Sequence, residues 1–274
     1  MSLVYHTGRI LGPGSRVLSA VAKTYRPFKL LFAAYKWIVV GPFLAFSTVV
    51  IGALIILLSG LGAPNFASRV FATAWAKLNS AVSMMTVTHK NMENLDPNRS
   101  YVIVSNHQSL YDIYVLYGFL GIDIKWVMKQ ELRAVPVLGA ACEAMGHIII
   151  DRSNTDAALN SINSARSRIV DGISVVFFPE GTRSRNGDLK TFKKGAFRFA
   201  LEMGLPILPV VIHGTKDILP SDSIDLMPGQ ETIEILPVIE TAGRTSNDLA
   251  QITRQAREQI GQALAHSERG FTSF

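Results

Sequence analysis

An uncharged apolar run near the N-terminus restricts the possible folds of this chain more than any other stretch. Trp37 to Leu58 is 22 almost wholly apolar residues, and no charged residue occurs between Trp37 and Ser68. A helix of about 20 such residues crosses the hydrocarbon core of a bilayer. The run is too long for an ordinary signal-peptide core and starts too far into the chain. We therefore expect attachment to a membrane and not a buried helix of a soluble protein.

A second helical pattern follows a break at residues 60–64, where two glycines and a proline interrupt the apolar run. From Asn65 to Met85, apolar and polar residues alternate at helical spacing, which is typical of an amphipathic helix at a membrane interface. The apolar side holds Phe66, Val70, Phe71, Ala74, Trp75, Leu78 and Met85, and the polar side holds Arg69, Thr73, Lys77 and Ser80. The two segments together predict a helical hairpin that enters one leaflet. A single span is the alternative, and the positive-inside rule would then place the rest of the chain on the non-cytosolic side.

The positive charge of the chain is concentrated in the same region. The net charge is +6, and residues 1–92 carry nine basic and no acidic side chains, which leaves 18 basic and 21 acidic side chains in residues 93–274. Such asymmetry favours an anionic partner for the N-terminal part, either a membrane surface or a nucleic acid. The basic residues adjoin an apolar segment instead of interleaving with groove-reading side chains, so we expect a membrane and no nucleic acid.

Short apolar runs alternate with polar helical segments beyond residue 93. This rhythm predicts an α/β fold, with a largely parallel sheet flanked by helices and with polar groups at the strand ends. We expect basic membrane-anchoring helices in residues 1–92 and an α/β domain in residues 93–274. Strands are predicted near 101–105, 123–128, 146–151, 173–178, 206–212 and 231–238, and helices near 109–120, 134–145, 155–170, 194–203 and 246–265, the last with Ser246 or Asn247 as its cap.

A polar cluster, Asn106-His107-Gln108-Ser109-Leu110-Tyr111-Asp112, joins the first of these strands to the following helix. An imidazole such as that of His107 takes a proton near neutral pH. A carboxylate on its other nitrogen, which Asp112 would supply, fixes the tautomer and stabilises the imidazolium. By itself, a His–Asp pair also fits a surface hydrogen bond or a helix cap.

A second cluster, Phe178-Pro179-Glu180-Gly181-Thr182-Arg183-Ser184, follows the strand near 173–178. With it, the sequence resembles the PlsC-type 1-acyl-sn-glycerol-3-phosphate acyltransferase family, whose signatures are NHxxxxD and FPEGTRS. Two weaker family blocks also match, at Gly146 to Arg152 and at Leu205 to Ile212. The resemblance covers residues 90 to 240.

The resemblance implies the glycerolipid acyltransferase fold with an N-terminal two-helix membrane motif. It also implies transfer of a fatty acyl group from acyl-CoA or acyl carrier protein to the sn-2 hydroxyl of lysophosphatidic acid, giving phosphatidic acid in phospholipid biosynthesis. The thioester is a co-substrate, and no cofactor is expected. We expect a monotopic protein of the bacterial inner membrane with its catalytic domain on the cytosolic face. Another lysolipid or glycerol 3-phosphate as acceptor stays open, as does a non-catalytic lipid-binding protein. A hydrolase is disfavoured because no serine lies in a nucleophile-elbow motif.

Roles for the motif residues follow from their chemistry and from the resemblance. We expect His107 to remove the proton of the acceptor hydroxyl while Asp112 holds the ring, so that no acyl-enzyme is needed. The resemblance implies that Glu180, Gly181, Thr182 and Arg183 bind the glycerol phosphate. Glycine permits close approach and arginine offers a planar fork for phosphate oxygens, whereas a carboxylate suits a glycerol hydroxyl or the orientation of Arg183.

Other polar residues are weaker candidates. Asn106, Lys129 and Arg152 are expected to contact the substrate, although Arg152 also fits a surface ion pair with Asp151. The cations Lys193, Lys194 and Arg198 suit a solvated helix face, or contact with CoA phosphates or an acidic carrier protein. His147 and His213 lie in apolar runs and fit buried core histidines. The scattered histidines and the single cysteine, Cys142, predict no metal site and no internal disulfide.

Overall fold

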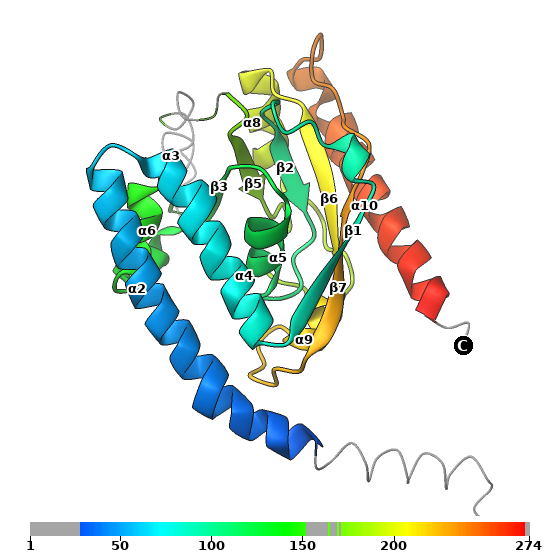
Figure 1. Cartoon of the computed structure of the whole chain (residues 1–274). Coiled ribbons are helices and arrows are strands. Elements are labelled where there is room, and N and C mark those ends of the chain that lie inside the picture. The colour runs from blue at the N-terminus through cyan, green and yellow to red at the C-terminus, as the bar shows by residue number, and fades with distance from the viewer. Residues whose placement is uncertain (1–27, 152–163, 165–168, 170, 272–274) are drawn as a thin grey trace, which may run out of the picture.

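A seven-stranded mixed sheet forms the centre of the computed structural model, which describes residues 28–151, 164, 169 and 171–271 (Figure 1). The strand order is β1-β7-β6-β2-β5-β3-β4, and every neighbouring pair is parallel except β6 with β7. The predicted largely parallel sheet is therefore confirmed. The strands are β1 (Met85–Lys90), β2 (Val102–Ser105), β3 (Ile124–Lys129), β4 (Ile148–Ile150), β5 (Ser174–Phe177), β6 (Ile207–His213) and β7 (Gly229–Ile235).

The central strands are buried on both faces, as their unbroken apolar sequences require. Val102 and Val104 of β2 belong to one hydrophobic core and Ile103 to the other, because successive side chains of a strand point to opposite faces. Helices α4 (Thr73–Val82) and α5 (Asp112–Phe119) cover the face of Ile103, and α8 (Gly195–Met203) and α10 (Leu249–Phe271) cover the face of Val102 and Val104 (Figure 1).

The N-terminal part forms a helical hairpin on the Ile103 side of the sheet. A short π-helical stretch, η1 (Lys36–Val40), leads into α2 (Gly41–Gly60), and the chain returns through α3 (Pro64–Phe66), η2 (Ala67–Ala72) and α4. Figure 1 shows α2 beside this returning segment, and α2 also packs against α6 (Leu138–Ala144). Phe28–Gly60 is long and apolar enough to cross a membrane, and only 22% of its most apolar window is buried inside the protein.

The returning segment of the hairpin packs against the protein mainly with its small residues. Ala67, Ser68, Ala72, Ala76, Asn79 and Ser80 are buried. In contrast, Phe66 is 56% exposed and Leu78 is 47% exposed, on the apolar side that the sequence assigns to a membrane interface. Small side chains allow α4 to approach α5 closely: a Cβ on Gly118 of α5 would lie 3.4 Å from Ala76 Cβ.

The sheet takes in residues on the N-terminal side of the predicted boundary at residue 93. Strand β1 pairs with β7 from Met85 to Lys90, where no strand was expected. The cap of the last helix also differs from the prediction. Thr245, and not Ser246 or Asn247, caps the 3₁₀ turn η6 (Ser246–Asp248) that precedes α10. Two further short elements, η4 (Gln130–Ala134) and α9 (Thr215–Ile218), were not predicted, and most of the helix expected near 155–170 lies outside the described residues.

Candidate active site

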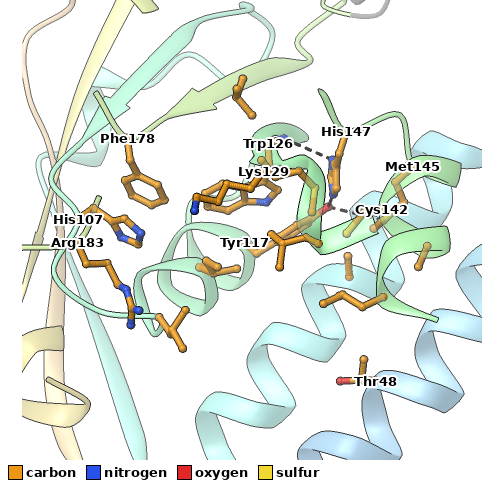
Figure 2. Close-up of a pocket in the computed structure, with 18 of the residues that line it drawn as sticks. Thr48, His107, Tyr117, Trp126, Lys129, Cys142, Met145, His147, Phe178 and Arg183 are labelled. Carbon is orange, nitrogen blue, oxygen red and sulfur yellow. Dashed lines mark hydrogen bonds between the residues drawn. The ribbon is translucent and has the colours of Figure 1, made fainter. Parts of the chain in front are cut away.

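His107 and Asp112 meet in the turn between β2 and α5. The Nδ1 atom of His107 lies 2.7 Å from Oδ2 of Asp112, and the His107 side chain is 15% exposed at the wall of a cavity. Asp112 is the first residue of α5, and its carboxylate points back across the turn that precedes the helix. The predicted pairing of the two residues is therefore present, with the far side of the imidazole left to face the cavity (Figure 2).

The Asp112 carboxylate is fully buried and held by four hydrogen-bond donors. Besides the imidazole, Oδ2 accepts hydrogen bonds from the backbone N–H groups of Gln108 at 2.8 Å and Ser109 at 2.9 Å. Oδ1 accepts one from the Thr215 hydroxyl at 2.5 Å. Several donors on one carboxylate fix its orientation. The geometry is that of an orienting carboxylate beside an imidazole base.

Asn106 ties the turn to the neighbouring strand. Its side-chain amide donates to the Ile212 carbonyl at 2.9 Å, and its side-chain oxygen accepts from the Ile212 N–H at 2.9 Å. The residue is buried and does not line the cavity. The structure therefore gives Asn106 the task of fixing the turn on β6, in place of the expected substrate contact.

Phe178 and Glu180 connect the second motif to the first. The ring of Phe178 stacks on the His107 imidazole with centroids 3.8 Å apart and planes inclined by 9°. The two carboxylate oxygens of Glu180 accept from the backbone N–H groups of His107 at 2.8 Å and Lys190 at 2.9 Å. Burial raises the pKa of Glu180, and these two bonds oppose that rise. Glu180 does not line the cavity. Instead of the predicted contact with glycerol or with Arg183, its carboxylate holds the backbone of the two loops that carry His107 and Lys190.

Gly181, Thr182 and Arg183, which the resemblance implies as glycerol phosphate contacts, lie at the mouth of the cavity. Gly181 has a φ of +78°, a conformation that strains any residue with a Cβ. The ammonium group of Lys190 donates to the Thr182 hydroxyl at 3.1 Å and to the Arg183 carbonyl at 2.6 Å. These contacts hold the turn so that its side chains face the cavity.

Lys129 completes a cationic mouth together with Arg183, Arg185 and Lys190, all four of which line the cavity. Figure 2 shows Lys129 and Arg183 on the same side of the cavity as His107. Lys129 is at the carboxyl end of β3, as the polar-strand-end argument predicted. Arg152, the other expected phosphate contact, lies outside the described residues.

The cavity has a volume of about 900 Å³ and is mostly apolar beyond this mouth. Its walls come from α2, η2, α4, α5 and α6, so the hairpin and the α/β part enclose it together. The deeper lining includes Ile51, Gly52, Ile55, Ala72, Trp75, Leu138, Ala141 and Met145. The arrangement joins a charged entrance beside an imidazole to an interior suited to a hydrocarbon chain.

A buried polar network borders this interior. The Tyr117 hydroxyl lies 3.1 Å from His147 Nε2 and 3.2 Å from the Ser68 hydroxyl, which donates to Asp123 at 3.0 Å. His147 is thus the buried, hydrogen-bonded histidine that the sequence predicted. Cys142 is buried in the cavity wall, and burial raises the pKa of its thiol to about 12, which keeps it protonated at neutral pH.

The remaining histidine and metal predictions concern other parts of the molecule. His213 binds Glu234 through Nε2 at 2.9 Å and is largely buried, as expected. Within the described ranges, no three His, Cys, Asp or Glu side chains are grouped to hold a metal ion.

Four contributors were missed from the sequence: Thr215, Lys190, Arg185 and Asp222. Thr215 lies two residues after the end of β6, as the first residue of α9, so the rule that polar residues near strand ends form sites identifies it in retrospect. Arg185 and Lys190 lie beyond the seven-residue motif that was read, one and six residues after its end. Asp222 is in a loop without a recognisable pattern.

The chain is similar in sequence to known acyltransferases. A family model described as Acyltransferase matches residues 86–213. A 1-acyl-sn-glycerol-3-phosphate acyltransferase of Chlamydomonas reinhardtii is 33% identical over 204 residues, which are 74% of this chain and 58% of that protein. The human 1-acyl-sn-glycerol-3-phosphate acyltransferase alpha is 31% identical over 172 residues, covering 62% of this chain and 61% of the human protein. The chain thus spans about three fifths of the length of these two curated relatives.

A solved structure shares the fold. The crystal structure of the 1-acyl-sn-glycerophosphate (LPA) acyltransferase PlsC from Thermotoga maritima superposes with a TM-score of 0.73, covering 89% of this chain and 97% of that chain. The sequence identity is 24%, so this likeness establishes the arrangement of the helices and the sheet.

Proposed function

We propose that this chain is an acyltransferase, like the family whose model matches residues 86–213, and that it transfers a fatty acyl group from a thioester to the sn-2 hydroxyl of lysophosphatidic acid, giving phosphatidic acid. The observation that carries this proposal is the position of the His107–Asp112 pair, at the junction between a cationic mouth and an apolar cavity. The names of the relatives support the same acceptor.

His107 acts as the general base in this reaction. Its Nε2 takes the proton from the acceptor hydroxyl while that oxygen attacks the thioester carbonyl. A carbon–oxygen bond forms, the carbon–sulfur bond breaks, and the departing thiolate receives the proton from the imidazolium. Asp112 stabilises the imidazolium between these two transfers, and the flat contact with Phe178 restricts the tilt of the ring.

General-base catalysis supplies about 10²- to 10⁴-fold, less than the 10⁶-fold or more that enzymes typically reach. Positioning of the two substrates supplies a further part. Arg183 and Lys190 suit the phosphate of the acceptor, since guanidinium and ammonium groups form charge-assisted hydrogen bonds to its oxygens. Lys129, on the same side of the cavity as His107, adds positive charge where negative charge develops.

A hydrocarbon chain is the occupant we assign to the apolar part of the cavity. Its lining by Ile51 and Ile55 of α2, with Leu138 and Met145 from the other side, matches an acyl chain in chemistry. Acyl-CoA and acyl carrier protein both present such a chain on a flexible thioester arm, and either serves as the donor in this proposal.

The exposed side of the hairpin supports placement in a membrane. Large apolar side chains face outward on α2, on the segment before it and on the residue after it, including Trp37, Ile38, Phe46, Val49, Leu57 and Leu61. A large exposed apolar patch on a protein surface marks a contact with lipid or with another protein. We propose a monotopic protein that enters the cytosolic leaflet of the bacterial inner membrane through this hairpin, with the mouth of the cavity at the membrane surface. A single span by Phe28–Gly60 is the competing topology.

The test is thiol release from acyl-CoA and from acyl carrier protein by the detergent-purified full chain, with and without lysophosphatidic acid. Thiol release should require lysophosphatidic acid and should be lost in the His107→Ala variant. His266→Ala, at an exposed position on α10, is the matched control and should behave as the wild type. A folded His107→Ala variant with wild-type turnover would contradict the mechanism.

The same assay separates the alternatives. Release that depends on glycerol 3-phosphate or another lysolipid, but not on lysophosphatidic acid, would change the acceptor. Release of free fatty acid without any acceptor would indicate a hydrolase. Binding of lysolipid without release from either donor would favour a non-catalytic lipid-binding protein.

A further inference from the structure

Asp222 lies between two guanidinium groups at the mouth of the cavity. One carboxylate oxygen, Oδ2, accepts a hydrogen bond from Nε of Arg185 at 2.7 Å. The other, Oδ1, lies 3.7 Å from Nη2 of Arg183. All three residues line the cavity. A single anionic group thus bridges two arginines at the place where the proposed function requires the phosphate of the acceptor.

The loop that carries Asp222 is fixed at its ends, and its tip, residues 220–223, has a local backbone hydrogen bond. It runs over residues 219–228, between α9 and β7. The Ser109 hydroxyl donates to the Leu219 carbonyl at 2.7 Å, and the Met227 N–H donates to the Ile218 carbonyl at 2.8 Å, which ties both ends to the site. Within the tip, the Ser223 N–H donates to the Pro220 carbonyl at 3.2 Å, and just beyond it the Lys36 ammonium group donates to the Ile224 carbonyl at 2.7 Å.

The backbone of Asp222 is in a conformation that needs support from its surroundings. Its φ is +62°, in the left-handed region that few non-glycine residues adopt, although aspartate does so more readily than most. Backbone strain of this kind persists where other contacts hold it, and it gathers at ligand-binding segments. The contacts to Arg183 and Arg185 supply such support.

We propose that Asp222 holds the place of the substrate phosphate: it neutralises Arg183 and Arg185 in the empty site, and the incoming phosphate displaces it and moves the loop tip. This inference rests on the proposed function. A phosphomonoester carries nearly two negative charges near pH 7 and more acceptor oxygens than a carboxylate. It therefore competes successfully with Asp222 for the two guanidinium groups. An uncharged acceptor has no means to displace Asp222, so the residue also discriminates against lipids without a phosphate.

The test compares phosphate affinity in matched variants of the full chain. Asp222→Asn keeps the shape of the side chain and removes its charge, and Asp222→Glu restores the charge. Asp225→Asn is the control, because Asp225 is exposed in the same loop and does not line the cavity. Isothermal titration with inorganic phosphate gives Kd, and turnover of lysophosphatidic acid gives KM and kcat for each protein.

Asp222→Asn should bind inorganic phosphate about three- to tenfold more tightly than the wild type, the range expected for loss of two partly exposed ion pairs. KM for lysophosphatidic acid should fall by a similar factor, with kcat within about twofold. Asp222→Glu and Asp225→Asn should stay close to the wild type.

An unchanged Kd in Asp222→Asn, or no phosphate binding by that variant, would overturn the inference, since nothing would then have been displaced. A weaker Kd would also overturn it and would make Asp222 a residue that orients the arginines. Either result alongside normal wild-type turnover would leave the proposed function standing. Tighter phosphate binding in Asp222→Asn without turnover by any of the proteins would support the inference and count against the proposed function.

Discussion

Glu180 binds the backbone of His107: its Oε1 atom accepts the His107 N–H at 2.8 Å. The carboxylate of the second motif thereby fixes the turn that carries the base of the first. Its other oxygen binds the N–H of Lys190, whose ammonium group holds Thr182 and the carbonyl of Arg183. One buried side chain therefore sets the relative positions of the base and of the cationic mouth.

Replacing Glu180 should reduce activity although the residue does not line the cavity. Glu180→Gln keeps one acceptor oxygen, so one of the two backbone bonds is lost, and kcat should fall about tenfold or more. Glu180→Ala leaves both N–H groups without their acceptor and should also destabilise the fold by about 2–4 kcal/mol. Steady-state kinetics and thermal unfolding of the purified variants measure the two effects. A fully active Glu180→Ala variant would contradict this role.

The orienting function of Asp112 predicts a graded series. Asp112→Asn presents an amide where three hydrogen-bond donors converge on Oδ2, favours the wrong imidazole tautomer, and should lower kcat by about 10³- to 10⁴-fold. Thr215→Val removes only the bond to Oδ1 and should lower kcat by about tenfold. Equal losses in the two variants would show that the Thr215 hydroxyl matters in its own right.

Gly52 should control the length of acyl chain that the cavity accepts. A Cβ at this position would lie 2.6 Å from Val137 Cγ1, so a larger side chain narrows the cavity between α2 and α6. Gly52→Leu should shift the preferred donor toward shorter acyl chains, measured as kcat/KM over a series of acyl-CoA substrates. Gly60→Ala, where a Cβ meets nothing within 4 Å, is the control and should keep the wild-type profile. A parallel loss for all chain lengths would indicate damage to the fold.

Glu231 should make the stability of the protein depend on pH. Both of its carboxylate oxygens are buried without a hydrogen-bond partner in the described part of the chain. Burial, together with the nearby charge of Asp112, raises its pKa to about 8. A carboxyl group with a raised folded-state pKa stabilises the fold most below its unfolded pKa, near 4.5, and that stability is lost as the pH rises through about 8.

The corresponding measurement is the free energy of unfolding of the wild type and Glu231→Gln from pH 5 to pH 9. The wild type should lose on the order of a few kcal/mol relative to the variant across this range, because only the wild type must bury a charge at high pH. Parallel pH profiles for the two proteins would mean that Glu231 finds a partner or stays hydrated.

The sequence was sufficient where a residue's role follows from its place at the end of a strand. The alternation of apolar runs and helices located most strands to within a few residues, and His107, Asp112, Lys129 and Arg183 lie together because parallel strands bring their carboxyl ends to one edge. Asn106 and Glu180 could not be assigned in this way. Both satisfy backbone groups of segments distant in sequence, and the pairing of buried polar groups depends on the completed fold.

For a related reason, the sequence did not predict which residues of the hairpin pack against the protein. An amphipathic pattern shows that two sides of a helix differ, but not which side faces protein when the other side can face lipid. In residues 64–82 the small residues pack inward and Phe66 and Leu78 face outward. Asp222 was missed because ion pairs between a loop and two motif arginines leave no periodic signal.

The cavity has one wall from the helices before residue 93 and another from the segments after it. A fragment that begins at residue 93, made to obtain a soluble enzyme, would therefore keep the His107–Asp112 pair but open the apolar chamber to water along its length. It would also lose β1, an edge strand of the sheet, and leave the edge of β7 unpaired. Solubility in this protein is better sought by changing the outward apolar residues of α2 than by shortening the chain.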